Sequence, residues 1–248
     1  TGASHAFEAP GSVSAFHSGS LLGQPGEILV IGLGRSRAHP NAKTSIVKYD
    51  RSGFQSLPVP SLNGSRITDI QVGPHGILVS ILDQKKRGTS YWVRDNEMVP
   101  AQSSTMGLQQ RALDDGSGVV IGRLYGDEPR SPGGLELVST QGVRRTLPSQ
   151  RGVRTLELAD LNRDGAEDIL IGDSWHYRYG QSAQATLAVL LGPDFKRRIP
   201  IGTIADSYTI QRAVVLPVTD NVKIVAIGSS SASLFVHHEI GWTQTRLT

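Results

Sequence analysis

The sequence contains no cysteine among its 248 residues. This absence excludes disulfide bonds, thiol catalysis and metal sites built from cysteine. It leaves the cellular compartment open, because many secreted bacterial proteins also lack cysteine. Long apolar runs are missing as well: none approaches the roughly 18 residues that a membrane-spanning helix needs, so we expect no transmembrane segment.

Sequence signals for several function classes are also absent. The formal net charge is only +3, which gives little support for specific binding of nucleic acid. We find no Ser–His–Asp order, no G-x-S-x-G elbow and no glycine-rich phosphate loop, so the usual motifs of hydrolases and nucleotide-binding enzymes are lacking. No signal peptide stands at the start, and we expect that processing has removed it or that this sequence omits it.

A short apolar segment recurs along the chain at onsets roughly 40–55 residues apart, a spacing typical of propeller blades. The five copies are EILVIGLG from Glu27, GILVSILD from Gly76, GVVIGRLY from Gly118, DILIGD from Asp168 and VKIVAIGSS from Val222. Each copy is rich in β-branched residues, which is typical of a strand buried on both faces. No stretch of ten residues shows convincing helical periodicity. We therefore expect an all-β chain made of five similar units.

Each unit contains more than its apolar segment. An alternating segment precedes every copy, and two further strand-like segments follow it, separated by turn residues. Four strands per unit, repeated radially, make a β-propeller, because each small sheet buries its faces against its neighbours. We predict an all-β fold, a five-bladed β-propeller of four-stranded antiparallel blades; a pair of β-sandwiches or a solenoid is the alternative.

The predicted propeller covers residues 12–248. Its blades lie at about residues 12–65, 66–106, 107–152, 153–208 and 209–248. Residues 1–11 are expected to form an N-terminal extension. Its SHAFEAP segment resembles a fourth strand, so it either latches onto the last blade or belongs to a sixth blade outside this sequence.

The stretch ADLNRDGAEDILIGD, residues 159–173, crowds oxygen-bearing side chains just before a predicted strand. Calcium takes six to eight oxygen ligands, and a short loop supplies them from positions 1, 3, 5 and 9 and from the backbone carbonyl of position 7. Here those ligands are Asp160, Asn162, Asp164, Asp168 and the carbonyl of Ala166, with Gly165 at the sharp turn. Position 12 is Ile171 instead of the glutamate of an EF-hand. An Asx-rich turn without metal is the alternative.

The same residues carry a resemblance to a known family. LADLNRDGAEDILIGD resembles an FG-GAP/VCBS repeat, the unit of integrin-α-like propellers, whose pattern is D-x-[DN]-x-D-G-x-x-D before an apolar strand. The resemblance implies that these side chains bind calcium in the hairpin between the first and second strands of a blade. The other units have lost the ligands, so we expect one structural calcium ion. The family commonly has seven blades, whereas this sequence predicts five.

A second group of residues is basic and aromatic. It lies in the predicted loops between second and third strands, which share one face of a propeller with the connections between blades. We expect these loops to dock an acidic partner: a protein, an anionic glycan or lipid head groups. A solvated loop face is the alternative. The candidate contact residues are Arg35, Arg37, Lys85, Lys86, Arg87, Arg130, Trp175, His176, Tyr177, Arg178 and Tyr179.

Together these features predict a non-catalytic, calcium-stabilised propeller that acts as a binding or scaffold subunit. A calcium loop favours an extracytoplasmic location, periplasmic or secreted, because calcium is abundant there. One alternative is a carbohydrate-binding lectin. Another is a glycosidase or lyase, for which the predicted first strands offer Asp69, Glu157 and little else as carboxylates, although such enzymes need a converging pair.

Overall fold

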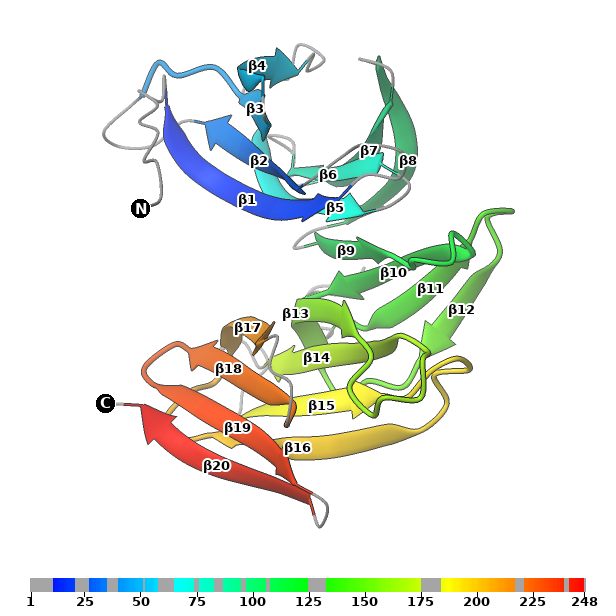
Figure 1. Cartoon of the computed structure of the whole chain (residues 1–248), viewed down its shortest axis with the longest axis vertical. Coiled ribbons are helices and arrows are strands. Elements are labelled where there is room, and N and C mark those ends of the chain that lie inside the picture. The colour runs from blue at the N-terminus through cyan, green and yellow to red at the C-terminus, as the bar shows by residue number, and fades with distance from the viewer. Residues whose placement is uncertain are drawn as a thin grey trace. The chain divides into compact units, whose positions relative to one another are not determined.

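A computed structural model describes the backbone of residues 11–20, 27–34, 40–50, 52–57, 65–73, 76–82, 87–94, 97–105, 108–124, 133–174, 184–216, 221–238 and 241–247. These residues form strands, turns and bends and contain no helix. The strands make five four-stranded antiparallel sheets (Figure 1). The chain divides into two compact units, Thr1–Ser104 and Thr105–Thr248.

The first unit contains two sheets, each formed by four consecutive strands in chain order. We call them blades 1 and 2. The strands of blade 1 are β1 (Ser12–Ser20), β2 (Glu27–Gly34), β3 (Ser45–Asp50) and β4 (Gly53–Leu57). Those of blade 2 are β5 (Arg66–Gly73), β6 (Gly76–Leu82), β7 (Arg87–Arg94) and β8 (Glu97–Thr105), the last of which reaches the boundary between the units.

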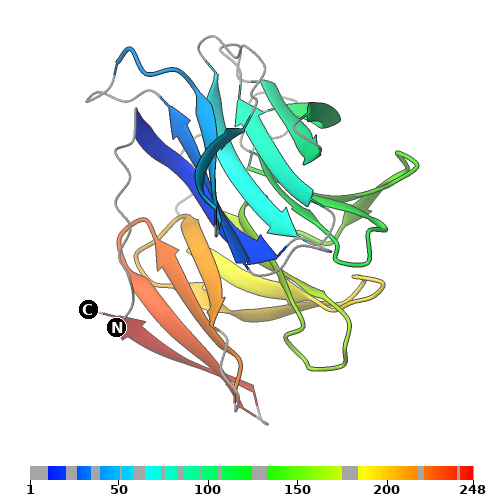
Figure 2. The same cartoon turned by 45° about the horizontal axis from the view of Figure 1, so that its top comes forward.

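The second unit contains blades 3, 4 and 5 with the same strand order. Blade 3 comprises β9 (Leu108–Ala112), β10 (Gly118–Arg123), β11 (Leu135–Ser139) and β12 (Arg144–Leu147). Blade 4 comprises β13 (Gly152–Ala159), β14 (Asp168–Ser174), β15 (Ala185–Leu190) and β16 (Arg198–Ile204). Blade 5, orange to red in Figure 2, comprises β17 (Ile210–Leu216), β18 (Lys223–Gly228), β19 (Ala232–His238) and β20 (Gly241–Leu247).

This architecture confirms the predicted fold class. Each recurring apolar segment is the second strand of a blade, and blade 5 obtains its fourth strand, β20, from its own sequence. The predicted N-terminal latch falls on residues 1–10, which lie outside the described residues. No helix in the described part of the chain has the length and apolar character that a bilayer crossing requires.

Neighbouring blades within a unit pack through apolar side chains. Blades 1 and 2 share one cluster, which includes Val30 and Ile70; blades 3 and 4 share a second, and blades 4 and 5 a third around Phe235. β14 is buried along its whole length, as predicted for a strand covered on both faces. Gly172 shows how close the sheets come, because a Cβ there would lie 2.8 Å from the Ile210 Cβ.

A β-bulge recurs in the first strand of blades 1, 2, 4 and 5. The register shifts fall between Val13 and Ala15, Ile67 and Asp69, Val153 and Thr155, and Ile210 and Arg212. The extra residues are Ser14, Thr68, Arg154 and Gln211. A bulge increases the local twist and redirects a side chain away from the regular alternation. The first strands therefore present their bulged residues outside the ordinary two-sided pattern.

Candidate functional site

The carboxylate-rich loop connects β13 to β14, the first and second strands of blade 4. The backbone pair of Ala159 and Asp168 closes the hairpin. Inside the loop, Arg163 and Gly165 take positive φ values of 64° and 88°. Glycine adopts such angles without steric cost, so Gly165 lies at the turn where the sequence predicted it.

Three of the predicted ligands, Asp160, Asn162 and Asp164, form one network on the exposed side of the loop. The Asp164 N–H donates to Asp160 Oδ1 (3.1 Å) and to Asn162 Oδ1 (3.0 Å). Asn162 Nδ2 donates to Asp164 Oδ2 at 2.8 Å, and the Gly165 N–H donates to Asp160 Oδ2 at 2.9 Å. The three side chains therefore converge on the same turn of backbone.

The Asp164 carboxylate is held in its ionised form. Its Oδ1 accepts a hydrogen bond from the Ala166 N–H at 2.8 Å. This bond, together with the one from Asn162, lowers the pKa of Asp164 below its ordinary value, because both donors favour the charged carboxylate. Asp164 thus presents charged, hard oxygen atoms on the exposed side of the loop.

Asp168, the fourth predicted side-chain ligand, has different surroundings. It is fully buried. Its Oδ2 accepts hydrogen bonds from the Leu161 N–H (2.9 Å) and the Asn162 N–H (3.2 Å), and its Oδ1 accepts one from the Gly192 N–H (2.8 Å). Burial raises the pKa of this carboxyl, and the three backbone donors oppose that rise. Asp168 therefore links the loop to the β15–β16 turn, a role that the sequence analysis missed.

We tested whether these residues fit a calcium ion. A carboxylate offers about four lone-pair positions, and Asp168 uses three on backbone donors, so one remains for a metal. In the described part of the chain, no three His, Cys, Asp or Glu side chains gather as metal ligands do. The side chains that do converge are those of Asp160, Asn162 and Asp164, two carboxylates and one carboxamide. Oxygen donors of this kind suit a hard cation.

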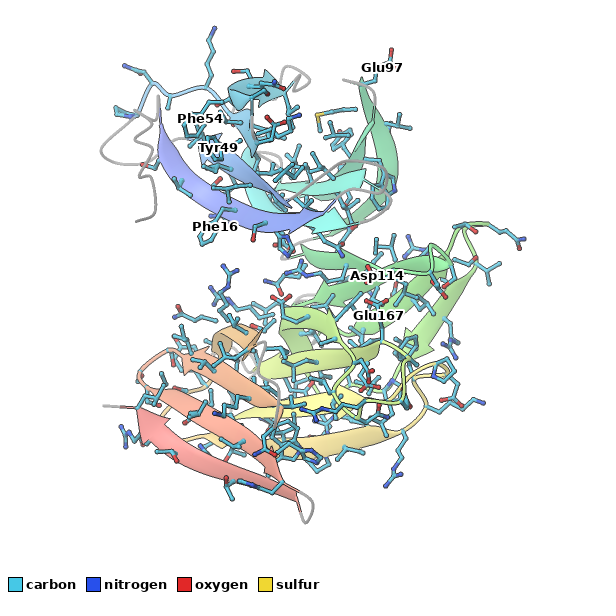
Figure 3. The ribbon with its side chains drawn as sticks, viewed as in Figure 1. Phe16, Tyr49, Phe54, Glu97, Asp114 and Glu167 are labelled. Atoms are coloured by element: carbon cyan, nitrogen blue, oxygen red, sulfur yellow. The ribbon has the colours of Figure 1, made fainter. Side chains whose placement is uncertain are left out.

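The loop also contacts blade 3. Glu167 Oε2 accepts a hydrogen bond from the Asp114 N–H at 2.7 Å, and Figure 3 shows these two residues side by side. Burial, followed by the charges of Asp114 and Asp115, raises the pKa of Glu167, while the hydrogen bond opposes the rise. Arg145 Nη1 of blade 3 donates to the Asp194 carbonyl of blade 4 at 2.9 Å. The loop is therefore part of the joint between two blades.

Glu157 is one of the two first-strand carboxylates considered above as catalytic acids, and it forms an ion pair with Arg111. Arg111 Nε and Nη2 reach its two carboxylate oxygens at 3.3 and 3.2 Å. Arg111 itself is buried. The two residues lie on the first strands of successive blades, an equivalence that the repeat could have revealed. Asp69, the other candidate acid, belongs to the other unit.

Most of the predicted partner face cannot be placed. Arg35, Arg37, Lys85, Lys86, Arg130, Trp175, His176, Tyr177, Arg178 and Tyr179 lie outside the described residues; Arg87 begins β7, but its side chain is not described. β14, the strand that leads into the loop containing Trp175, Tyr177 and Tyr179 (the aromatic loop), is described: Asp173 is buried and accepts a hydrogen bond from Arg198. The basic face therefore stays a prediction.

Comparisons with known proteins identify the fold alone. No family model and no curated protein sequence matches this chain. A solved structure of hydrazine synthase from Kuenenia stuttgartiensis matches 99% of this chain and 68% of its own, with a TM-score of 0.60 and 11% identity. Sqt1 from Saccharomyces cerevisiae matches 97% and 63%, with a TM-score of 0.55 and 9% identity.

The fucose-specific lectin from Aleuria aurantia matches 94% of this chain and 77% of its own, with a TM-score of 0.58 and 12% identity. All three structures are β-propellers. This chain is a β-propeller too. At sequence identities this low, the ligand or reaction of one propeller cannot be assigned to another, because the fold hosts many unrelated functions.

Proposed function

We propose that this propeller is a non-catalytic, calcium-stabilised binding or scaffold subunit that works outside the cytoplasm. The observation that carries the proposal is the oxygen network of Asp160, Asn162 and Asp164. It lies in a hairpin between the first and second strands of a blade, where the FG-GAP/VCBS resemblance implies a calcium ion. We accordingly assign the chain to an FG-GAP-like group as part of the proposal.

In this proposal the ion is held by Asp160, Asn162 and Asp164 through their side chains and by Ala166 through its carbonyl. Asp168 fixes the backbone from which these ligands project and has one lone pair to contribute. The ion supplies positive charge to a loop of converging carboxylates and performs no chemistry. Its effect is to order the β13–β14 hairpin of blade 4, which contacts blade 3 through Glu167.

Calorimetric titration of the chelator-treated protein with CaCl2 tests the calcium proposal. We expect one calcium site. We also expect the melting temperature to rise with calcium, because a ligand at 100 times its Kd stabilises the folded state by about 2.7 kcal/mol. Asp164→Ala should abolish both effects. Asp115→Ala is the matched control, because Asp115 also accepts a local backbone N–H, from Ser117 at 2.8 Å, in the corresponding hairpin of blade 3. Equal loss in both variants, or no binding by the unaltered protein, contradicts the proposal.

The binding role is proposed for the basic loops, with an acidic partner. It is supported by their charge and by the ion pair that occupies Glu157, which weakens the case for a pair of catalytic carboxylates. The test is retention of the protein on immobilised poly-L-glutamate, heparin and anionic vesicles at low and high salt. We expect retention on at least one of them to fall with salt, since salt screens exposed charges. Absence of retention on all three contradicts the docking role.

A further inference from the structure

A hydrogen-bonded knot joins blades 4 and 5 where β13 and β17 begin. Thr155 Oγ1 donates to the Ile210 carbonyl at 3.0 Å. Ser174 Oγ accepts hydrogen bonds from the Ile210 N–H at 3.2 Å and from Thr209 Oγ1 at 3.0 Å. All four residues are buried. The knot therefore fixes the backbone at one end of both blades, the end from which the aromatic loop after Ser174 departs.

Tyr208 precedes Thr209 of this fixed backbone, and its side chain is exposed. Its neighbours Ser207 and Thr209 are 2% and 3% exposed, whereas Tyr208 is 50% exposed. Ser207 is held by the Ser230 N–H, which donates to its Oγ at 3.3 Å, and its carbonyl accepts from the Ala185 N–H at 2.7 Å. An aromatic ring on a rigid support loses little entropy when a partner covers it.

Two bulged residues flank the same knot. Arg154 precedes Thr155 in β13, and Gln211 follows Ile210 in β17; both side chains are exposed. No other described residue forms a hydrogen bond or an ion pair with the Arg154 guanidinium. The nearby carboxylate of Asp206 is 3.5 Å from Arg246 Nη1, so a cation already offsets its charge. The knot thus carries an exposed aromatic ring, a guanidinium and a carboxamide.

We infer that Arg154, Tyr208 and Gln211, which we call the knot patch, form a contact surface for an acidic segment of a protein partner. Tyrosine and arginine are the residues that most often dominate protein interfaces. The guanidinium suits a carboxylate through paired hydrogen bonds, and the carboxamide suits a peptide group. Tyr208 is half exposed, whereas sites for small ligands are concave and enclose most of the ligand, which favours a protein segment over a single sugar. The inference rests on the proposed docking role and extends it to β13, β17 and the connection before β17.

The test measures binding of fluorescein-labelled poly-L-glutamate by anisotropy at fixed salt. Arg154→Gln and Tyr208→Ala should each weaken binding at least about fivefold, the size of effect expected for an interface residue that matters. Tyr208→Phe should retain most of the binding, because the ring is kept. Arg197→Gln is the matched control: it removes the same charge from an exposed arginine in the β15–β16 turn of blade 4, at the other end of the sheet.

The outcomes separate this inference from the proposed function. A fourth variant replaces Arg35, Arg37, Lys85 and Lys86 by glutamine. If it alone loses binding, the basic loops dock the partner and the knot patch does not. If only the knot variants lose binding, the patch is right and the loop proposal is wrong. Equal weakening by Arg154→Gln and Arg197→Gln, no binding by the unaltered protein, or weakened binding of heparin without any effect on poly-L-glutamate overturns the inference.

Discussion

Replacing Asp168 by alanine should destabilise the protein even when no calcium is present. Its two carboxylate oxygens accept hydrogen bonds from the backbone N–H groups of Leu161, Asn162 and Gly192. The alanine side chain accepts none, so the substitution leaves three backbone donors without their partner. Because Asp168 is fully buried and its bond to the Leu161 amide is buried too, water does not replace it at that donor.

The magnitude follows from these three bonds. An unsatisfied buried donor costs about 1–3 kcal/mol, which gives about 3–9 kcal/mol for the set. The Asn162 and Gly192 amides are only partly buried, so water can reach them after a small movement of the loop. We therefore expect a loss in the free energy of unfolding near the lower end, about 3–4 kcal/mol.

Urea denaturation in excess chelator, followed by circular dichroism, measures this loss. Asp164→Ala is the comparison, because it removes a carboxylate from the exposed side of the same loop and should cost about 1 kcal/mol or less without metal. A cost below about 1 kcal/mol for Asp168→Ala, or equal costs for the two variants, would refute the supporting role of Asp168. In that case only the proposed role of Asp168 as a calcium ligand would account for an aspartate at this position.

Three further predictions concern other parts of the molecule. His17 Nδ1 of β1 accepts the Val72 N–H of β5 at 3.2 Å, so His17→Leu removes the acceptor and should lower the free energy of unfolding by about 0.5–1.5 kcal/mol, measured with urea; an unchanged value would show that this bond does not help to hold blades 1 and 2 together. Hydrogen bonds from Lys48 and then Ser52 lower the pKa of Asp50 to about 2. The ionised Asp50 carboxylate therefore stabilises the fold above pH 3.8, and this stabilisation is lost as the pH falls through about 2. An NMR titration should show this pKa, and Lys48→Met should raise it. Gly172→Ala should lower stability by about 1–3 kcal/mol, because the added carbon would meet Ile210 at 2.8 Å; an unchanged melting temperature would show that the sheets can separate at no cost.

The fold could be predicted because its signal is repeated. The second strand of a blade is covered on both faces, so DILIGD and its relatives are apolar throughout and stand out at a regular spacing. The bulges could not be predicted in the same way. A bulge at Arg154 or Gln211 adds one residue to a strand, and the alternating pattern tolerates that addition without a distinctive residue type.

The sequence predicted which residues form the candidate site, but not how their side chains are oriented. Spacing alone showed that Asp160 through Asp168 offer oxygen atoms at intervals suited to calcium. It could not show that Asp168 is buried and turned toward backbone amides, because that orientation depends on the Gly192 turn, which is distant in sequence. The Arg111–Glu157 pair was missed for a related reason: its members are 46 residues apart, and only the alignment of successive blades makes them neighbours.

The length of the hairpin explains why one blade retains the acidic pattern. In the shorter β9–β10 connection the backbone satisfies two of its own donors, since the Leu113 N–H donates to the Gly118 carbonyl and the Gly116 N–H to the Leu113 carbonyl, while Asp115 accepts the Ser117 N–H. In the longer loop of blade 4, side chains of Asp160, Asn162, Asp164 and Asp168 accept the backbone donors instead. If calcium binds as proposed, the same residues serve the fold and the ion, and a change of charge separates the two roles. Asp160→Asn keeps one acceptor but removes a negative charge, so it should preserve most of the stability in chelator and weaken calcium binding in the calorimeter. A variant that loses both equally would mean that the carboxylate serves the fold alone.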